Sequence, residues 1–334
     1  MKFKFLNLSF FIMLITNILM LFINSWFYMW MIMEINLICF IKMLKSNKNF
    51  NNELIMNYFI IQSFNSYMFF MSFMLMESEF LKQMFLIIMI FTMMSKLGLP
   101  PFMMWYFKMM INLKCWMMFF INSCIQKFIP LMVINYLMIN KNNMMNLIML
   151  TFIMILIFLP FLGMNSYNIS LMMSISSIVQ MLWLILLISI NEIWIIYFLL
   201  YSLISFTIFM MFKMYNIYHI LDMYMLKFKN ISSFYILNIN ILSLGGLPPF
   251  LGFMMKFLYI WNLMKTFMMT MILLILMSLI NLFFYMRPMY SFLSMSFSSK
   301  NYLFKVINMN NKKMNLYINL SMITMMAMLI LEMI

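Results

Sequence analysis

Long apolar runs follow one another along almost the whole chain and restrict what it can fold into. Of the 334 residues 67% are hydrophobic, whereas only 21 are basic and 7 acidic. A transmembrane helix needs ~20 mostly apolar residues, and no stretch here carries the roughly one-quarter charged content of a soluble domain. The composition therefore predicts an all-α polytopic membrane protein. It excludes a soluble enzyme with appended domains.

The spacing of the apolar runs predicts about eleven transmembrane helices. To within a few residues at each end, the runs lie at 5–23, 26–44, 54–76, 84–107, 115–138, 144–163, 168–190, 193–212, 235–262, 266–286 and 315–333. Hydropathy over such windows is the standard signal for membrane spans. We expect one membrane domain over 1–334, with a first repeat at 5–138, a second at 144–286 and a C-terminal helix at 315–333.

The connections between the runs carry their positive charge unevenly. Most basic residues fall on the side that holds the N-terminus, and the other side has only Lys82, Lys141 and Lys265. The positive-inside rule then puts the N-terminus in the matrix. The formal net charge of +14 is explained by this topology and by attraction to anionic lipids such as cardiolipin. No motif that reads a nucleic-acid groove accompanies it.

Residue usage indicates where the chain is made. Methionine occurs 54 times and phenylalanine 39 times, against 5 glycines, which is typical of an AT-biased mitochondrial genome. The opening residues run straight into an apolar span without an Arg-rich presequence. We therefore expect a multi-pass protein of the mitochondrial inner membrane, with an AT-rich nuclear or bacterial gene as the alternative.

Four charged residues lie well inside the predicted spans, away from the span ends. They are Glu34, Lys96, Lys127 and Lys256. A charge at the bilayer centre costs ~2.5–3.5 kcal/mol, so such residues mark a transport pathway or a paired site. The alternative is a lysine near a span end that reaches the lipid headgroups, which fits Lys42 and is open for Lys256.

One string, GLPPF, occurs twice, at 98–102 and at 246–250. Proline removes a backbone donor and glycine tolerates non-helical angles, so each copy should interrupt its span. Broken backbone is tolerated at membrane depth only where it faces protein or a watery cavity. The copies lie five spans apart and hence in antiparallel helices. This predicts inverted five-helix repeats with two discontinuous helices.

The buried lysines lie close to these interruptions. Lys96 stands where a half-helix ends, and its free carbonyls favour a cation there. Lys256 follows the second copy, so we expect it near the positive start of the next half-helix. Pro130 lacks an N–H and leaves the Gln126 carbonyl free beside Lys127.

Glu34 is the one carboxylate deep in a predicted span. Burial disfavours a charged amine and a nearby carboxylate favours it, so a partner that moves makes a lysine a proton switch. We expect Glu34 to be the movable partner of Lys96. The alternative is a static ion pair that ties two helices together.

Redox chemistry is not expected in this chain. His219 is the single histidine and falls in a basic loop, and no G-x-G-x-x-G or phosphate loop is present. Cys39, Cys115 and Cys124 lack the paired spacing of a cluster or disulfide framework. We therefore predict no metal and no cofactor in this chain.

Several strings resemble one known family. They are WMIMEIN at 30–36, YFIIQSFNS at 58–66, KLGLPPFMMW at 96–105, QKFIP at 126–130, SISSIVQMLW at 174–183 and LSLGGLPPFLGFMMK at 242–256. They resemble the subunit 2 family of mitochondrial NADH:ubiquinone oxidoreductase (respiratory complex I) in its insect-like form, which is an antiporter-like membrane subunit. The resemblance covers most of the chain.

This resemblance implies a proton pathway through Glu34, Lys96, Lys127 and Lys256. It also implies that NAD, FMN, iron–sulfur clusters and ubiquinone are held by other subunits, and that other membrane subunits are the partners. The chain departs from the family pattern at several positions: Met103, Phe107, Lys108, Gln180 and Leu182. Gln180 replaces a histidine and cannot titrate, so a route past it requires water held by the neighbouring serines.

Three functions are compatible with these residues. The first is a proton-translocating subunit of complex I, driven by quinone reduction elsewhere in the assembly. The second is a free-standing cation/proton antiporter, which needs the same proton-binding groups. The third is a passive scaffold whose buried charges only specify helix packing. The sequence leaves the proton stoichiometry and the coupling mechanism open.

Overall fold

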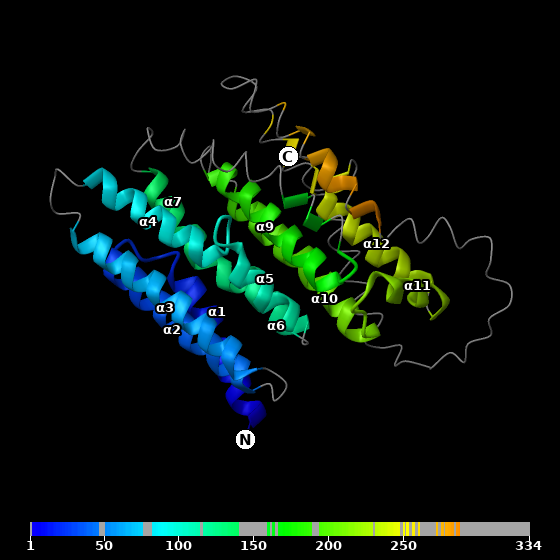
Figure 1. Ribbon diagram of the computed structural model, residues 1–334, viewed down its shortest axis with the longest axis horizontal. Coiled ribbons are helices and arrows are strands. Elements are labelled where there is room, and N and C mark those ends of the chain that lie inside the picture. The colour runs from blue at the N-terminus through cyan, green and yellow to red at the C-terminus, as the bar shows by residue number, and fades with distance from the viewer. Residues whose placement is uncertain are drawn as a thin grey trace. The chain divides into compact units, whose positions relative to one another are not determined.

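The computed structural model describes most of the first three-quarters of the chain (Figure 1). The described residues are 2–46, 51–75, 82–113, 116–139, 159–160, 162–163, 166–188, 194–229, 231–247, 250, 252–253, 256–257, 260, 272, 275–276, 278–283 and 285–287. The chain divides into two compact units, Met1–Leu147 and Ile148–Ile334.

The first unit is a bundle of helices that pack in sequence order. Its elements are α1 (Lys2–Leu19), α2 (Trp26–Ser46), α3 (Asn52–Leu75), α4 (Lys82–Leu97), α5 (Met103–Asn112), α6 (Trp116–Phe120), the π-helical turn η2 (Ile121–Ile125) and α7 (Gln126–Ile139). Helix α2 packs against α1 and α3, α3 against α4, and α4 against α7. In Figure 1 these elements run from blue through cyan to teal.

Helices α6, η2 and α7 follow one another without a gap between Trp116 and Ile139. They correspond to the span expected at 115–138. Inside it the backbone N–H of Gln126 donates to the Ile121 carbonyl five residues back, the hydrogen bond that defines a π turn. Nothing in the sequence analysis anticipated this turn.

The second unit is built around α9 (Ile169–Ile188), which is buried on all sides. Helix α10 (Trp194–Tyr215) packs against α9 and also against α12 (Ile231–Gly245), which contacts α11 (Ile220–Lys229). In α9, 94% of the membrane-length window is buried inside the protein, as expected for a helix that is apolar all round.

The segment that contains α11 corrects one expectation, because the sequence analysis assigned His219 and the residues after it to a loop. The Asp222 carboxylate accepts hydrogen bonds from the backbone N–H groups of Tyr218 at 2.9 Å and His219 at 2.8 Å. A carboxylate in the first turn that reaches back in this way satisfies donors that a helix start leaves free. The segment is therefore helical despite its charges.

Three of the described helices are long and apolar enough to cross a membrane. They are α2, α9 and α10, and each ends within three residues of the span expected for it. The span expected at 315–333, most of the one at 144–163 and about half of the one at 266–286 lie outside the described residues. The described part of the chain is nearly all helical and contains one isolated β-bridge, between Asn168 and His219.

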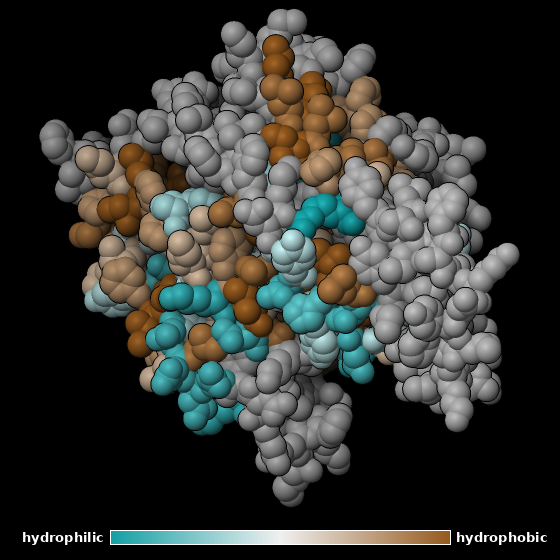
Figure 2. All heavy atoms as spheres, turned by 45° about the vertical axis from the view of Figure 1, so that its right-hand side comes forward, coloured by the Kyte–Doolittle hydropathy of each residue, from teal (hydrophilic) through white to brown (hydrophobic). Residues whose placement is uncertain are grey.

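Apolar side chains lie on the surface of the described helices. Figure 2 shows brown and tan hydrophobic residues over much of the described surface on one face. In the first unit Phe11 is 62% exposed and Phe22 78%. A large exposed apolar surface of this kind suits contact with lipid or with other membrane helices.

Candidate functional site

Helix α4 ends at the first GLPPF copy in a Schellman motif. Gly98 has φ +70°, its N–H donates to the Ser95 carbonyl at 3.2 Å, and the Leu99 N–H donates to the Met94 carbonyl at 3.0 Å. These are the two hydrogen bonds of that motif, and glycine adopts the left-handed conformation readily. A Cβ on Gly98 would lie 2.7 Å from Tyr106 Cβ. The expected first interruption is therefore present, and α5 begins beyond it at Met103.

Side chains from other helices also donate hydrogen bonds to carbonyls in the last turn of α4. Trp105 Nε1 donates to the Ser95 carbonyl at 3.1 Å, and Gln62 Nε2 from α3 donates to the Lys96 carbonyl at 3.5 Å. A buried helix end needs such partners because its last carbonyls have none within the helix. The break is thus held by both α3 and α5.

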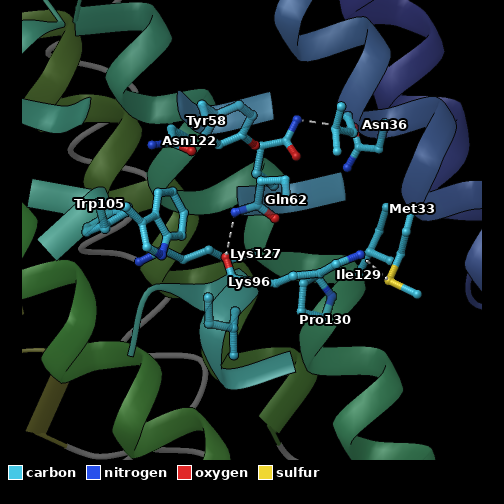
Figure 3. A pocket seen from close by; sticks show the side chains of 14 residues that line it. Met33, Asn36, Tyr58, Gln62, Lys96, Trp105, Asn122, Lys127, Ile129 and Pro130 are labelled. Carbon is cyan, nitrogen blue, oxygen red and sulfur yellow. Dashed lines mark hydrogen bonds between the residues drawn. The ribbon is translucent and has the colours of Figure 1, made fainter. Parts of the chain in front are cut away.

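A polar cavity lies beside this break and brings two of the expected site lysines together (Figure 3). Both Lys96 and Lys127 line it. Its other lining residues are Met33, Asn36, Leu37, Tyr58, Gln62, Leu97, Trp105, Tyr106, Asn122, Gln126, Ile129 and Pro130. The space open to the centres of water molecules is ≈ 30 Å³, and by that measure one water needs roughly 10–15 Å³. The cavity has room for water between titratable groups.

Lys127 is held by an aromatic ring on the wall of this cavity. Its side chain is 3% exposed, and Nζ lies 4.2 Å from the centroid of the Tyr106 ring. Such a cation–π contact stabilises a desolvated cation by roughly 2 kcal/mol. Pro130 lies inside α7, one turn further on. The aromatic ring is therefore one of the groups that stabilise this ammonium.

Glu34 and Lys96 lie close together without forming a direct ion pair among the described residues. The Ser66 hydroxyl donates to the Glu34 carboxylate, whereas Lys96 Nζ contacts the Met33 sulfur at 3.3 Å. The carboxylate nevertheless attracts the Lys96 ammonium electrostatically. Ser66 and Met33 were not recognised as site residues from the sequence. Only the packing between α2, α3 and α4 reveals them.

A second polar group near the cavity was also missed. Gln126 Nε2 donates to the Asn36 side-chain oxygen at 3.3 Å and contacts the Met13 sulfur at 3.3 Å. Asn17 on α1 donates to the carbonyl of Ile125 at the π turn, at 3.1 Å. The π turn beside Lys127 is therefore stabilised from α1, a helix to which the sequence gave no role in the site.

Helix α12 ends in a related way at the second GLPPF copy, of which Pro248 and Pro249 lie outside the described residues. Gly246 has φ +81°, and its N–H donates to the carbonyls of Leu242 at 3.0 Å and Ser243 at 3.2 Å. The next carbonyl, of Leu244, accepts a hydrogen bond of 2.8 Å from Gln180 Nε2. The helix is interrupted here, as expected.

Lys256 lies in helical backbone beyond the second break, as expected, but its side chain lies at the carbonyl end of α12. Its side chain is 5% exposed, and Nζ donates to the Gly245 carbonyl at 3.0 Å, at the negative C-terminal end of α12. The expectation placed it near the positive start of the following half-helix. The side chain reaches back across the break because the free carbonyl attracts an ammonium. The Trp183 ring centroid lies 5.7 Å from Nζ.

An uncharged network surrounds the end of α12. The Tyr197 hydroxyl donates to the Gln180 side-chain oxygen, and the buried Tyr285 ring lies against Gly245. A small cavity beside Gln180 and Tyr197 has ≈ 10 Å³ open to water centres.

The described residues at the two breaks include no cluster of metal-ligating side chains. Within those residues no three His, Cys, Asp or Glu side chains lie together. What the two breaks do provide is amines, hydroxyls and amides beside hydrogen-bonded carbonyls and small cavities. The amines can accept, hold and release protons, and the hydroxyls and amides can hydrogen-bond the water that carries them.

Two broken helices with buried lysines beside the breaks define a class of ion-translocating membrane subunits. The chain belongs to the NADH:quinone oxidoreductase/Mrp antiporter transmembrane family, whose model matches residues 23–282. The resemblance stated from the sequence is confirmed. The chain is 32% identical to NADH-ubiquinone oxidoreductase chain 2 of Anopheles gambiae over 93% of this chain and 92% of that protein. It is 29% identical to the chain of the same name from Lumbricus terrestris over 79% of each.

Solved structures share the fold at low sequence identity. Respiratory complex I from Thermus thermophilus with bound aureothin contains a chain that matches with a TM-score of 0.76 and 13% identity, over 91% of this chain and 73% of that chain. The Mrp complex from Dietzia sp. contains one with a TM-score of 0.67 and 10% identity, over 80% of this chain and 57% of that chain.

Proposed function

We propose that this chain is a proton-translocating membrane subunit of NADH:ubiquinone oxidoreductase, which moves protons while quinone is reduced elsewhere in the complex. The observation that carries the proposal is the polar cavity shared by Lys96 and Lys127 beside the first helix break, with Lys256 on the carbonyl end at the second break. The relatives named NADH-ubiquinone oxidoreductase chain 2 support the assignment to that complex.

In this proposal Glu34 modulates Lys96. When the carboxylate approaches, the ammonium is stabilised, and when it withdraws, burial favours loss of the proton. Lys127 receives the proton through water in the shared cavity, because its ammonium faces a neutral ring that attracts a cation without taking its proton. Lys256 passes the proton to the far side of the membrane.

The middle of the route depends on neutral groups. Gln180 stands where the family pattern has a histidine, and an amide does not titrate. Water hydrogen-bonded to Gln180, Tyr197 and the buried serines of α9 would carry the proton there. The small cavity beside Gln180 has the volume of about one water by the same measure.

The arrangement in the membrane is part of the proposal. We propose eleven transmembrane helices in one domain, inverted five-helix repeats, and the N-terminus on the matrix side of the mitochondrial inner membrane. NAD, FMN, iron–sulfur clusters and ubiquinone are bound by other subunits, and the redox reaction takes place outside this chain. Other membrane subunits and lipids, including cardiolipin, cover the exposed apolar surface.

Replacement of the buried lysines tests the function. Lys96→Met and Lys256→Met in the assembled complex, reconstituted in vesicles, should lower the ratio of protons translocated to electrons transferred. Lys108→Met is the matched control, because Lys108 is exposed on α5 and has no place in the route. An unchanged ratio in both buried-lysine variants contradicts the proposal and favours the passive scaffold, for which these changes would only weaken assembly.

A free-standing cation/proton antiporter is the second candidate. The family itself includes Mrp antiporters, and the fold matches a chain of an Mrp complex. Gentle solubilisation followed by native separation distinguishes the two. A subunit of the reductase migrates with a very large flavin-containing assembly, whereas a free antiporter does not.

A further inference from the structure

Glu34 and Lys96 are each held by a neutral neighbour. The Ser66 hydroxyl on α3 donates to the Glu34 carboxylate, and the Met33 sulfur on α2 receives the Lys96 ammonium at 3.3 Å. Both neighbours are buried, Ser66 at 1% exposed and Met33 at 5%. Each of the two charges therefore has a partner of its own, although they attract each other.

The Ser66 hydroxyl has a second acceptor within reach. Its oxygen also lies 2.8 Å from the Ser63 backbone carbonyl, one turn back on α3. A serine hydroxyl carries one hydrogen, which can be donated to one acceptor fully at a time. If Glu34 leaves, Ser66 turns to the Ser63 carbonyl, so no buried donor is left without an acceptor. The large free-energy cost of an unsatisfied group is avoided.

The Met33 sulfur is a weak acceptor. It can give up the Lys96 ammonium at little cost, because a thioether is stable in apolar surroundings without a hydrogen bond. A carboxylate in the same place would bind the ammonium much more strongly. Met33 precedes Glu34 on α2, so one helix carries both alternative partners of the lysine.

We propose that Ser66 and Met33 are positioning residues for the Glu34–Lys96 pair. They hold the carboxylate and the ammonium apart, and they let the two form an ion pair without leaving a buried group without a hydrogen-bond partner. The inference rests on the proposed function, because it concerns how that pair switches. No covalent bond changes when the pair closes. The Ser66 hydrogen stays on its oxygen and only its acceptor changes.

Ser66→Ala tests the first half of this proposal in the assembled complex. Without the hydroxyl, Glu34 loses its alternative partner and the closed pair is favoured by about tenfold or more, the effect of one hydrogen bond to a charged group. The rate of quinone-coupled proton translocation should fall by about that factor. The carboxylate infrared band of Glu34, assigned by its loss in Glu34→Gln, should shift.

The matched control is Ser63→Ala on the same helix. The Ser63 hydroxyl donates only to the Ile60 carbonyl in the described contacts, so that variant should keep both the rate and the infrared band. Ser66→Thr retains a hydroxyl and should restore both. If Ser66→Ala behaves like Ser63→Ala, the proposal is overturned.

Met33→Leu tests the second half, with Met31→Leu as its control because Met31 is 40% exposed on the same helix. Loss of a weak acceptor should lower the rate about two- to threefold, less than Ser66→Ala does. Equal rates in the two methionine variants contradict this part.

Comparison with the lysine variants separates this inference from the proposed function. If Lys96→Met lowers the proton-to-electron ratio while Ser66→Ala changes neither rate nor infrared band, only the inference fails. If Lys96→Met and Lys256→Met both leave the ratio unchanged, the proposed function fails with it.

Discussion

Helices α4 and α12 both end on a glycine of positive φ, Gly98 at +70° and Gly246 at +81°. In each case a glutamine from a neighbouring helix donates to a carbonyl of the last turn. The lysines differ. Lys96 belongs to the last turn of α4 itself, whereas Lys256 follows the break and donates to the final carbonyl of α12.

The direction of helical side chains explains this difference. Side chains on an α-helix point toward its N-terminus. The Lys96 side chain therefore points away from the C-terminal carbonyls of α4 and contacts Met33 on α2 instead. Lys256 comes after the break and can reach back. The same kind of helix end therefore leaves Lys96 in contact with a sulfur of a neighbouring helix and Lys256 on a backbone carbonyl.

The largest effect is expected for Gly252→Ala at the second break. A Cβ there would lie 1.8 Å from the Ser243 backbone oxygen, and backbone cannot move aside as a side chain can. The variant should lose about 3 kcal/mol or more of stability and fail to assemble, as measured by the amount of complex on native gels. Gly245→Ala is the control, since its Cβ would meet only the Tyr285 ring, at 3.3 Å. Equal losses from the two changes would contradict this reading.

Tyr106→Leu should give the next largest effect, at the first break. It removes the ring beneath the Lys127 ammonium, a contact of roughly 2 kcal/mol when desolvated, and should lower the rate of proton translocation about tenfold. Tyr106→Phe keeps the ring and should remain close to the wild-type rate. A low rate in both variants would show that the Tyr106 hydroxyl, and not the cation–π contact of its ring, supports proton translocation.

Gln180→Leu should lower the stability of the helix end at the second break. It leaves the Leu244 carbonyl and the Tyr197 hydroxyl without the partner they have now, at about 1–3 kcal/mol for each unsatisfied group. A double-mutant cycle with Tyr197→Phe, read from thermal inactivation rates of the complex, should give a coupling energy of at least about 0.5 kcal/mol. Strict additivity would show that the two side chains act independently.

Gln62→Leu, the corresponding change at the first break, should have the smallest effect. Its donor–acceptor distance is 3.5 Å, against 2.8 Å for Gln180, and long hydrogen bonds are weak. We expect a loss of about 0.5 kcal/mol, measured by the same inactivation assay. A loss as large as that of Gln180→Leu would remove the distinction between the two helix ends.

The sequence predicted the helices that are long and apolar. Helix α9 was expected at 168–190 and is Ile169–Ile188, and α10 was expected at 193–212 and is Trp194–Tyr215. Helix α11 was missed because its charged residues resemble a loop. Its start depends on Asp222, a single side chain that accepts two backbone hydrogen bonds.

The sequence identified the residues of the candidate site but not the contacts between them. Glu34, Lys96 and Lys127 stand out because charge is rare in apolar segments. That Lys96 and Lys127 line one cavity was not predictable, nor was the contact of Lys256 with the Gly245 carbonyl. The roles of the four residues as a pathway remain a prediction.

By itself, the sequence determined the class of protein, the ends of α4 and α12, and the residues that carry buried charge. These are local properties, since a bilayer offers no water to the backbone and glycine sets a helix end from its own conformational freedom. Only the tertiary structure decided which groups hold those charges. Ser66 reaches Glu34 across 32 residues of sequence, and Asn17 reaches Ile125 across 108, because such contacts depend on which faces of the helices pack together.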